Sequence, residues 1–310
     1  MKIKIVITIF SLLFFLLISE LYFAAYVYKE QKRLDERDPK EIKFAYHKPF
    51  ISDLNSIFWD NTKFRYYDKN SDKTIMILGC SYAYGEGLKN KENLSALLSE
   101  ALKYNVINAG FGGHGIQSAY KFLKDFWLEK EKKNNVDIFI YVYMKDHLRR
   151  IYKRNNWFSG EIYPHFEYRD SHLVEIKPIF PYIYASFLFF NLNNRIIHKK
   201  LYEELKTYKD FNIIISELQN TIKKINPNSK TIILVVPVKY THEFIADNSM
   251  FPSNELTFLE ELGIKVINAE ELTNENLRDE KWYIEDKSHP SSQYWQLIVP
   301  KLSEIIKSMK

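Results

Sequence analysis

Two short segments near opposite ends of the chain carry residue types that could perform serine chemistry together. Ser81 follows Gly79 closely after an apolar run, and Asp286 and His289 lie three residues apart just before Pro290. A serine hydroxyl becomes a strong nucleophile when a nearby base accepts its proton, and a carboxylate can hold that base in place. Either segment alone is a weak signal, since a serine after a glycine is often a helix cap and an Asp-x-x-His pair often an ordinary polar loop.

An alternation of strands and helices would position these residues. Five short apolar runs are typical of buried parallel strands, at residues 74–78, 105–108, 137–143, 231–238 and 265–268. Apolar residues recur at helical spacing in 92–103, 117–132, 211–225 and 294–309. The pattern predicts an α/β domain with a mostly parallel sheet.

Within such a sheet, Ser81 would lie just beyond the carboxyl end of the first strand, where open α/β sheets bind ligands. Pro290 disfavours a helical conformation at His289, and Ser291 or Ser292 suits the N-cap of the final helix. Asp286 and His289 are therefore expected on one exposed loop. A carboxylate on that loop could reach one ring nitrogen while the other faces outward.

The combination of a Gly-Cys-Ser turn and an Asp-x-x-His-Pro loop resembles the SGNH/GDSL hydrolase family, over about residues 73–305. The resemblance implies a flavodoxin-like three-layer α/β/α sandwich and cleavage of esters or O-acyl groups. It implies that Ser81 is the nucleophile, His289 the base and Asp286 the residue that orients the base. Neither a metal nor a cofactor is implied.

The resemblance extends to two further blocks that supply oxyanion donors. Residues 108–115 look like the second block, and Gly113 would give a backbone N–H beside that of Ser81. Residues 143–147 fall where the third block is expected, with Lys145 at the position of the side-chain donor. Asp146 and His147 are candidate substrate contacts.

Two positions depart from the family pattern. Cys80 replaces the usual Asp before the nucleophile, and Lys145 replaces the usual Asn. Lys145 or His147 could donate a hydrogen bond in place of that Asn. Alternatively, the oxyanion hole has backbone donors alone, which would lower the rate by about 10²–10³-fold. Two alternatives to an esterase therefore stay open: a catalytically degenerate carbohydrate-binding or assembly protein, and an O-acyltransferase.

The first residues predict a membrane anchor. Residues 5–27 are almost wholly apolar, and 23 residues at about 1.5 Å each can span the hydrocarbon of a bilayer. A cleaved signal peptide is the rival interpretation, and the small-residue pattern for cleavage is poor. We expect a single-pass anchor at 1–28, a juxtamembrane linker at 29–70 and an extracytoplasmic hydrolase-like domain at 71–310.

One segment interrupts the alternation. Residues 147–207 are rich in aromatic side chains and form an insertion, either a cap over the site or a helical elaboration without substrate contact. At its start, Arg149 and Arg150 could bind an anionic group or form a solvated helix end. His165, Glu167 and His172 within it are better explained as a surface cluster than as metal ligands.

Composition excludes several classes of protein. A net charge of +5 without a basic cluster gives no nucleic-acid footprint, and the one cysteine, Cys80, permits neither an intrachain disulfide nor a cysteine zinc site. Residues 110–115 also match G-x-G-x-x-G, which suggests a dinucleotide site. The acid expected to end the next strand is missing there, because Asp137 begins that strand.

Overall fold

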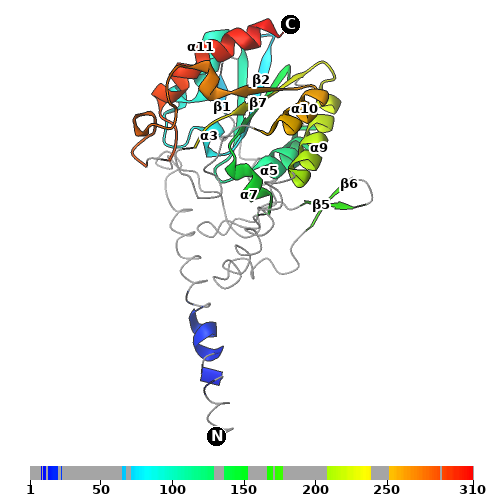
Figure 1. Cartoon of the computed structure of the whole chain (residues 1–310), viewed down its shortest axis with the longest axis vertical. Helices are drawn as coiled ribbons and strands as arrows, with labels where there is room; N and C mark the ends of the chain where they lie inside the picture. The colour runs from blue at the N-terminus through cyan, green and yellow to red at the C-terminus, as the bar shows by residue number, and fades with distance from the viewer. Residues whose placement is uncertain are drawn as a thin grey trace.

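A six-stranded sheet organises the computed structural model, which describes residues 65–67, 71–128, 136–152, 166–169, 172–176, 208–238, 251–286 and 288–309, with parts of 8–22 (Figure 1). The strands are β1 (Arg65–Tyr67), β2 (Thr74–Gly79), β3 (Asn105–Gly110), β4 (Ile138–Tyr143), β7 (Lys230–Val235) and β8 (Ile264–Asn268). Their order is β1-β3-β2-β4-β7-β8, and only β1 runs antiparallel to its neighbour.

The central strands are apolar along their whole length because both faces of the sheet are covered. Every residue of β4 is buried, as are five of the six residues of β2. In the parallel register, Gly79 of β2 lies opposite Gly110 of β3 and Val142 of β4. The carboxyl ends of the three strands therefore meet at one edge of the sheet.

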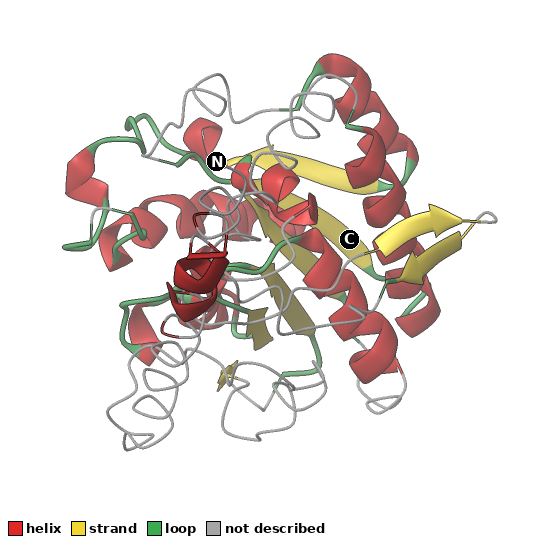
Figure 2. Ribbon diagram, turned by 90° about the horizontal axis from the view of Figure 1, so that it is seen from below, coloured by secondary structure: helices red, strands yellow, loops and turns green. Residues whose placement is uncertain are grey.

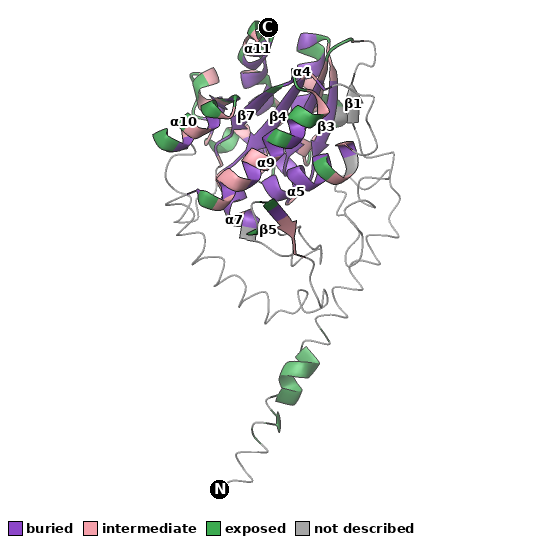
Figure 3. Cartoon of the chain, turned by 90° about the vertical axis from the view of Figure 1, so that its right-hand side faces the viewer, coloured by how far each residue is buried: buried purple, intermediate pink, exposed green. Residues whose placement is uncertain are grey.

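Helices pack on both faces (Figure 2). One face carries α5 (Ile116–Lys121) with its π-helical continuation η2 (Phe122–Trp127), α7 (Asp146–Tyr152), α9 (Lys209–Ile225) and α10 (Ser253–Glu261). The other carries α4 (Leu94–Leu102) and α11 (Ser292–Ser308), with the short α3 (Ser81–Tyr84). Figure 3 shows the buried sheet between these layers. Three 3₁₀ turns complete the body: η1 (Asn90–Glu92), η4 (Ala269–Leu272) and η5 (Glu280–Trp282).

The predicted α/β sandwich is confirmed. Numbered along the chain, the five parallel strands stand in the order 2-1-3-4-5, the order of flavodoxin-like folds. Each strand covers most of one of the predicted apolar runs. The linker predicted at 29–70 is too long, because residues 65–67 form β1 and pair with β3.

The insertion at 147–207 is described only in part. Its first residues belong to α7, and a hairpin of β5 (Phe166–Arg169) and β6 (His172–Glu175) follows. Phe166 and Leu173 of the hairpin are buried against the core of the α5 and α9 face. The remainder of the insertion, and with it the choice between a cap over the site and a helical elaboration without substrate contact, lies outside the described residues.

The expected anchor at 5–27 lies largely outside the described residues. Its described positions are helical, and Figure 3 colours them as exposed; their large apolar side chains are 45–75% exposed, with Phe10 at 73% and Phe15 at 72%. Among the described residues, no helix combines the length and the hydropathy that a membrane span needs.

Candidate active site

A sharp turn after β2 places Ser81 at the edge of the sheet. Gly79 ends the strand with φ of +140°, and a Cβ at this position would lie 2.8 Å from the carbonyl oxygen of Val142. A side chain here would thus push β2 and β4 apart, so the turn requires glycine. Ser81 then begins α3 with only 6% of its surface exposed.

The loop between η5 and α11 carries the other two predicted residues. The carboxylate of Asp286 accepts hydrogen bonds from the amides of Ser288 (2.8 Å) and His289 (2.9 Å), which closes the loop into a tight turn. The amide of Ile284 donates to the carbonyl oxygen of His289 (2.9 Å). Ser291 is the N-cap of α11, as the sequence predicted.

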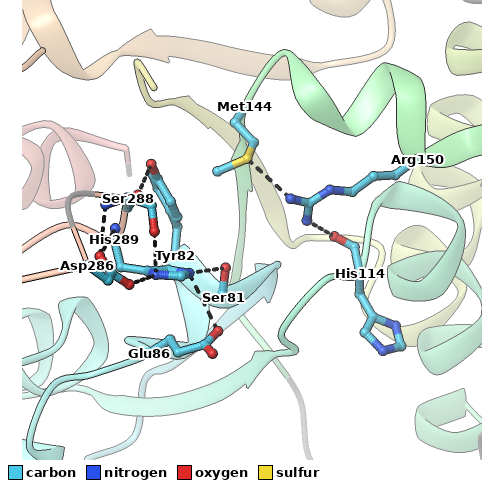
Figure 4. Close-up of polar contacts among 9 residues, drawn as sticks. All are labelled: Ser81, Tyr82, Glu86, His114, Met144, Arg150, Asp286, Ser288 and His289. Carbon is cyan, nitrogen blue, oxygen red and sulfur yellow. Dashed lines mark hydrogen bonds and ion pairs between the residues drawn. The ribbon is translucent and has the colours of Figure 1, made fainter. Parts of the chain in front are cut away.

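The structure brings the three residues together (Figure 4). His289 Nε2 lies 3.0 Å from Ser81 Oγ, and His289 Nδ1 hydrogen bonds to Asp286 Oδ2. Because a carboxylate only accepts, Nδ1 carries the proton and Nε2 is left to accept from the Ser81 hydroxyl. This is the arrangement of nucleophile, base and orienting carboxylate that serine catalysis requires.

Hydrogen bonds keep the Asp286 carboxyl ionised. Partial burial would raise its pKa, but the hydrogen bonds from the His289 ring and from the amides of Ser288 and His289 outweigh burial and lower the pKa of Asp286 below its ordinary value. The stability from these bonds is present above the ordinary carboxyl pKa and is lost as the pH falls through the lowered value. Asp286 is therefore an anion throughout the neutral range.

Tyr82 joins the two halves of the site, a contact that the sequence did not predict. Its hydroxyl donates a 2.6 Å hydrogen bond to the carbonyl oxygen of Ser288, and its ring centroid lies 5.9 Å from that of His289. Burial raises the pKa of Tyr82 far above its ordinary value, so the hydroxyl stays protonated and can donate. The residue next to the nucleophile thus holds the histidine loop in place.

Removing this hydroxyl is expected to loosen the loop. Tyr82→Phe leaves the Ser288 carbonyl without its donor, and we expect a loss of about 1 kcal/mol in the free energy of unfolding. Ester turnover should fall by about 3–10-fold, because small displacements of His289 weaken its bond to Ser81. Thermal unfolding and turnover measure both effects. Tyr168→Phe, at an exposed side chain, is the control; wild-type behaviour in both variants would contradict the role of Tyr82.

The predicted oxyanion donors follow the carboxyl ends of neighbouring strands of the sheet. Gly113 lies in the turn between β3 and α5, and Lys145 is half-buried between β4 and α7. Cys80, which stands where the resembled family has an acid, is fully buried in the apolar cluster that includes Tyr82 and Ala83. The roles of the Ser81 amide, Gly113 and Lys145 as donors stay predictions.

Asp146 forms an ion pair with Arg150. Arg150 Nε donates to Asp146 Oδ2 (2.7 Å), and both side chains are only 13% exposed. The same guanidinium donates to the carbonyl oxygen of His114 (2.8 Å) and contacts the sulfur of Met144 (Figure 4). Arg150 is thus no solvated helix end; it braces the turn that contains Gly113 against α7.

The prediction that His147 contacts a substrate does not fit this structure. Its ring is fully buried, with Nδ1 2.7 Å from the hydroxyl of Tyr141 and the ring packed against Tyr143. Burial, reinforced by the nearby positive charge of Arg150, lowers the pKa of His147 well below its ordinary value. A neutral ring inside the core can neither touch a ligand nor donate to an oxyanion.

A carboxylate that the sequence did not single out also faces His289. Glu86 Oε2 lies 3.6 Å from His289 Nε2, and a Cβ built on Gly112 would lie 3.3 Å from the same oxygen. This carboxylate lies against Gly112 in the glycine-rich loop at 110–115, in which the dinucleotide alternative would place a pyrophosphate. Two anions would repel one another there, which opposes that alternative.

In the described part of the chain, no group of three or more His, Cys, Asp and Glu side chains is arranged so that it could hold a metal ion. Glu167 of β5 is paired with Arg169 at 2.6 Å. His165 lies outside the described residues.

Comparison with solved structures gives likenesses to hydrolases. A protein assigned to the lipolytic G-D-S-L family from Desulfitobacterium hafniense is 14% identical, with a TM-score of 0.44 over 76% of this chain and 99% of that one. TesA is 12% identical, with a TM-score of 0.46 over 77% of this chain and 100% of that one. A carbohydrate esterase of family 3 from Talaromyces cellulolyticus is 11% identical, with a TM-score of 0.43 over 76% of this chain and 98% of that one. Proteins named as GDSL-family members and as carbohydrate esterases are thus among the solved structures that the chain resembles.

No protein-family model matches the sequence, and no curated protein matches it. At such low identities the likenesses concern the arrangement of the chain. The chemistry therefore has to be argued from the side chains themselves.

Proposed function

We propose that this protein is a serine esterase that cleaves ester or O-acyl groups through an acyl-enzyme on Ser81. The observation that carries the proposal is the 3.0 Å contact between Ser81 Oγ and His289 Nε2, with Asp286 bound to the opposite ring nitrogen. A serine hydroxyl positioned in this way is activated for attack on a carbonyl carbon.

The proposed reaction has two halves. His289 Nε2 takes the Ser81 proton while Oγ attacks the ester carbonyl, and the ionised Asp286 stabilises the imidazolium that forms. The tetrahedral intermediate collapses, the C–O bond to the alcohol breaks, and Nε2 returns its proton to the leaving oxygen. Water then repeats the sequence in reverse and releases the carboxylic acid.

Charge on the tetrahedral oxygen needs donors close to Ser81. We assign this role to the backbone amides of Ser81 and Gly113, with Lys145 as the candidate side-chain donor. The bonds from Arg150 to the His114 carbonyl and to Asp146 support the assignment, because they hold the Gly113 turn rigid against α7. Asp146 therefore acts through Arg150 and not as a substrate contact.

We further propose that residues 5–27 anchor the protein in a membrane, with the α/β domain outside the cytoplasm. The length of the apolar run and the exposure of the described apolar side chains in it support an anchor. An enzyme held there would meet acyl groups on cell-surface carbohydrate or lipid. Membrane fractionation followed by protease digestion of intact cells tests this; recovery of the chain in the soluble fraction would count against the anchor.

Hydrolysis of p-nitrophenyl esters from acetate to long acyl chains tests the proposed activity. We expect turnover of at least the short-chain esters by the full-length protein. Turnover that appears only when an alcohol or sugar is added would favour an O-acyltransferase. The absence of both reactions, in protein that is folded by circular dichroism, would favour a degenerate, binding-only protein.

A further inference from the structure

Glu86 is built into the site by its backbone as well as by its side chain. The amides of Gly85 and Glu86 both donate to the carbonyl oxygen of Ser81, at 2.9 and 3.0 Å. Gly85 has φ of +79° and ends α3 in the left-handed conformation, which turns the chain back beside the nucleophile. Glu86 therefore keeps a fixed relation to Ser81, five residues before it.

The Glu86 carboxylate meets the working nitrogen of the base. Its Oε2 lies 3.6 Å from His289 Nε2, the same nitrogen that lies 3.0 Å from Ser81 Oγ (Figure 4). The separation is too long for a direct hydrogen bond. The oxygen atom of a further molecule that is hydrogen-bonded to Nε2 would therefore also lie within hydrogen-bonding distance of the Glu86 carboxylate.

Residues from three segments act on this carboxylate, which is 14% exposed. His289 of the loop before α11 and Gly112 of the turn after β3 lie against it, and the charges of Asp286 in the same loop and of Arg150 in α7 act on it. Burial, with a smaller contribution from the charge of Asp286, raises the pKa of Glu86 against the opposing effects of His289 and Arg150. A buried carboxylate that opposes folding calls for a functional reason.

We propose that Glu86 holds the water that attacks the acyl-enzyme. This rests on the proposed esterase function. The attacking water has to give one proton to His289 Nε2, and at that position Glu86 can accept a hydrogen bond from its second O–H. Asp286 orients the ring from the far side; Glu86 positions the nucleophile on the near side.

The step consumes water and needs no other reactant. The water oxygen attacks the acyl carbonyl carbon while one of its protons passes to His289 Nε2. The tetrahedral intermediate then breaks its bond to Ser81 Oγ, and Nε2 returns the proton to that oxygen. Glu86 accepts a hydrogen bond throughout and is unchanged at the end.

The isosteric variant Glu86→Gln separates the two halves of the reaction. With p-nitrophenyl acetate and the full-length protein, we expect a burst of one p-nitrophenol per chain, an acetylated form visible by intact mass, and release of that acetyl group about 10–100-fold more slowly than from wild type. Reaction with a fluorophosphonate, which needs the activated Ser81 but no attacking water, should proceed at a rate close to that of wild type. Glu100→Gln, at an exposed position of α4, is the matched control.

A further readout distinguishes positioning from a structural role. Glu86→Gln removes a carboxylate whose ionisation opposes folding, so we expect its melting temperature at neutral pH to rise by about 2–4 °C. The gain should shrink as the pH falls through the raised pKa of Glu86 and vanish below the ordinary carboxyl pKa, where wild-type Glu86 is protonated in both the folded and the unfolded state.

Equal deacylation rates in Glu86→Gln and wild type would overturn the proposal. So would a parallel loss of fluorophosphonate reaction and deacylation, which would place Glu86 in the activation of Ser81 instead. Failure of the esterase function itself has another signature, because wild type would then show neither turnover nor fluorophosphonate reaction.

Discussion

Ser81→Ala is expected to lower ester turnover by about 10⁴–10⁶-fold while the protein stays folded. The substitution removes the only atom that can form the acyl-enzyme and leaves His289 and the oxyanion donors in place. Ser81 makes its side-chain contact with His289 alone among the described hydrogen bonds, so little stability should be lost. Initial rates with p-nitrophenyl acetate and thermal unfolding measure the two quantities.

The control for this variant is Ser308→Ala, at an exposed serine that ends α11. It should keep wild-type turnover. A Ser81→Ala protein that hydrolyses the ester within about tenfold of wild type would show that hydrolysis occurs elsewhere, because residual catalysis without the nucleophile is far smaller.

Asp286→Asn is expected to lower turnover by about 10³–10⁴-fold. The amide oxygen of Asn can still accept from the amides of Ser288 and His289, so the loop should keep its shape. Its NH₂ group can donate to Nδ1, however, which favours the tautomer whose Nε2 carries a proton and cannot accept from Ser81. The variant also removes the anion that stabilises the imidazolium.

Turnover and melting temperature of Asp286→Asn should be compared with those of Glu285→Gln, which neutralises the exposed neighbouring acid. We expect Glu285→Gln to behave as wild type. If Asp286→Asn retained more than about a tenth of wild-type turnover, the carboxylate would have no part in orienting the base.

The three residues of the candidate site could be singled out in the sequence because each has a local signal. Ser81 comes two residues after Gly79 at the end of an apolar strand, and Asp286 and His289 come before a proline and the N-cap of the last helix. Parallel strands align their carboxyl ends, so a residue after β2 and a loop before α11 could be expected at one edge of the sheet.

The supporting contacts could not be predicted in the same way. The bond from Tyr82 to Ser288 joins residues 206 positions apart, and tyrosine has no sequence signal that specifies such a partner. The site carboxylate did have a signal that the sequence analysis missed. Glu86 stands between Gly85 and Gly87, both with positive φ, which marks a tight turn beside the nucleophile.

A position just after the end of a strand was not enough to predict that His147 reaches the site. Asp146 and His147 follow β4 together, yet Asp146 pairs with Arg150 near the site while His147 turns into the core beside Tyr141. Consecutive residues at the start of a helix point in directions about 100° apart, and sequence alone does not say which one faces the sheet edge. Strand β1 escaped prediction because three residues without an apolar run give no periodic pattern.

Covalent labelling of the full-length protein with a fluorophosphonate, followed by mapping of the labelled peptide, tests the activated serine most directly. We predict one label per chain, on the peptide that contains Ser81, with no label in Ser81→Ala and slow labelling in His289→Ala. Label on another residue, or folded wild-type protein that does not react, would contradict the assignment of Ser81 as a nucleophile activated by His289.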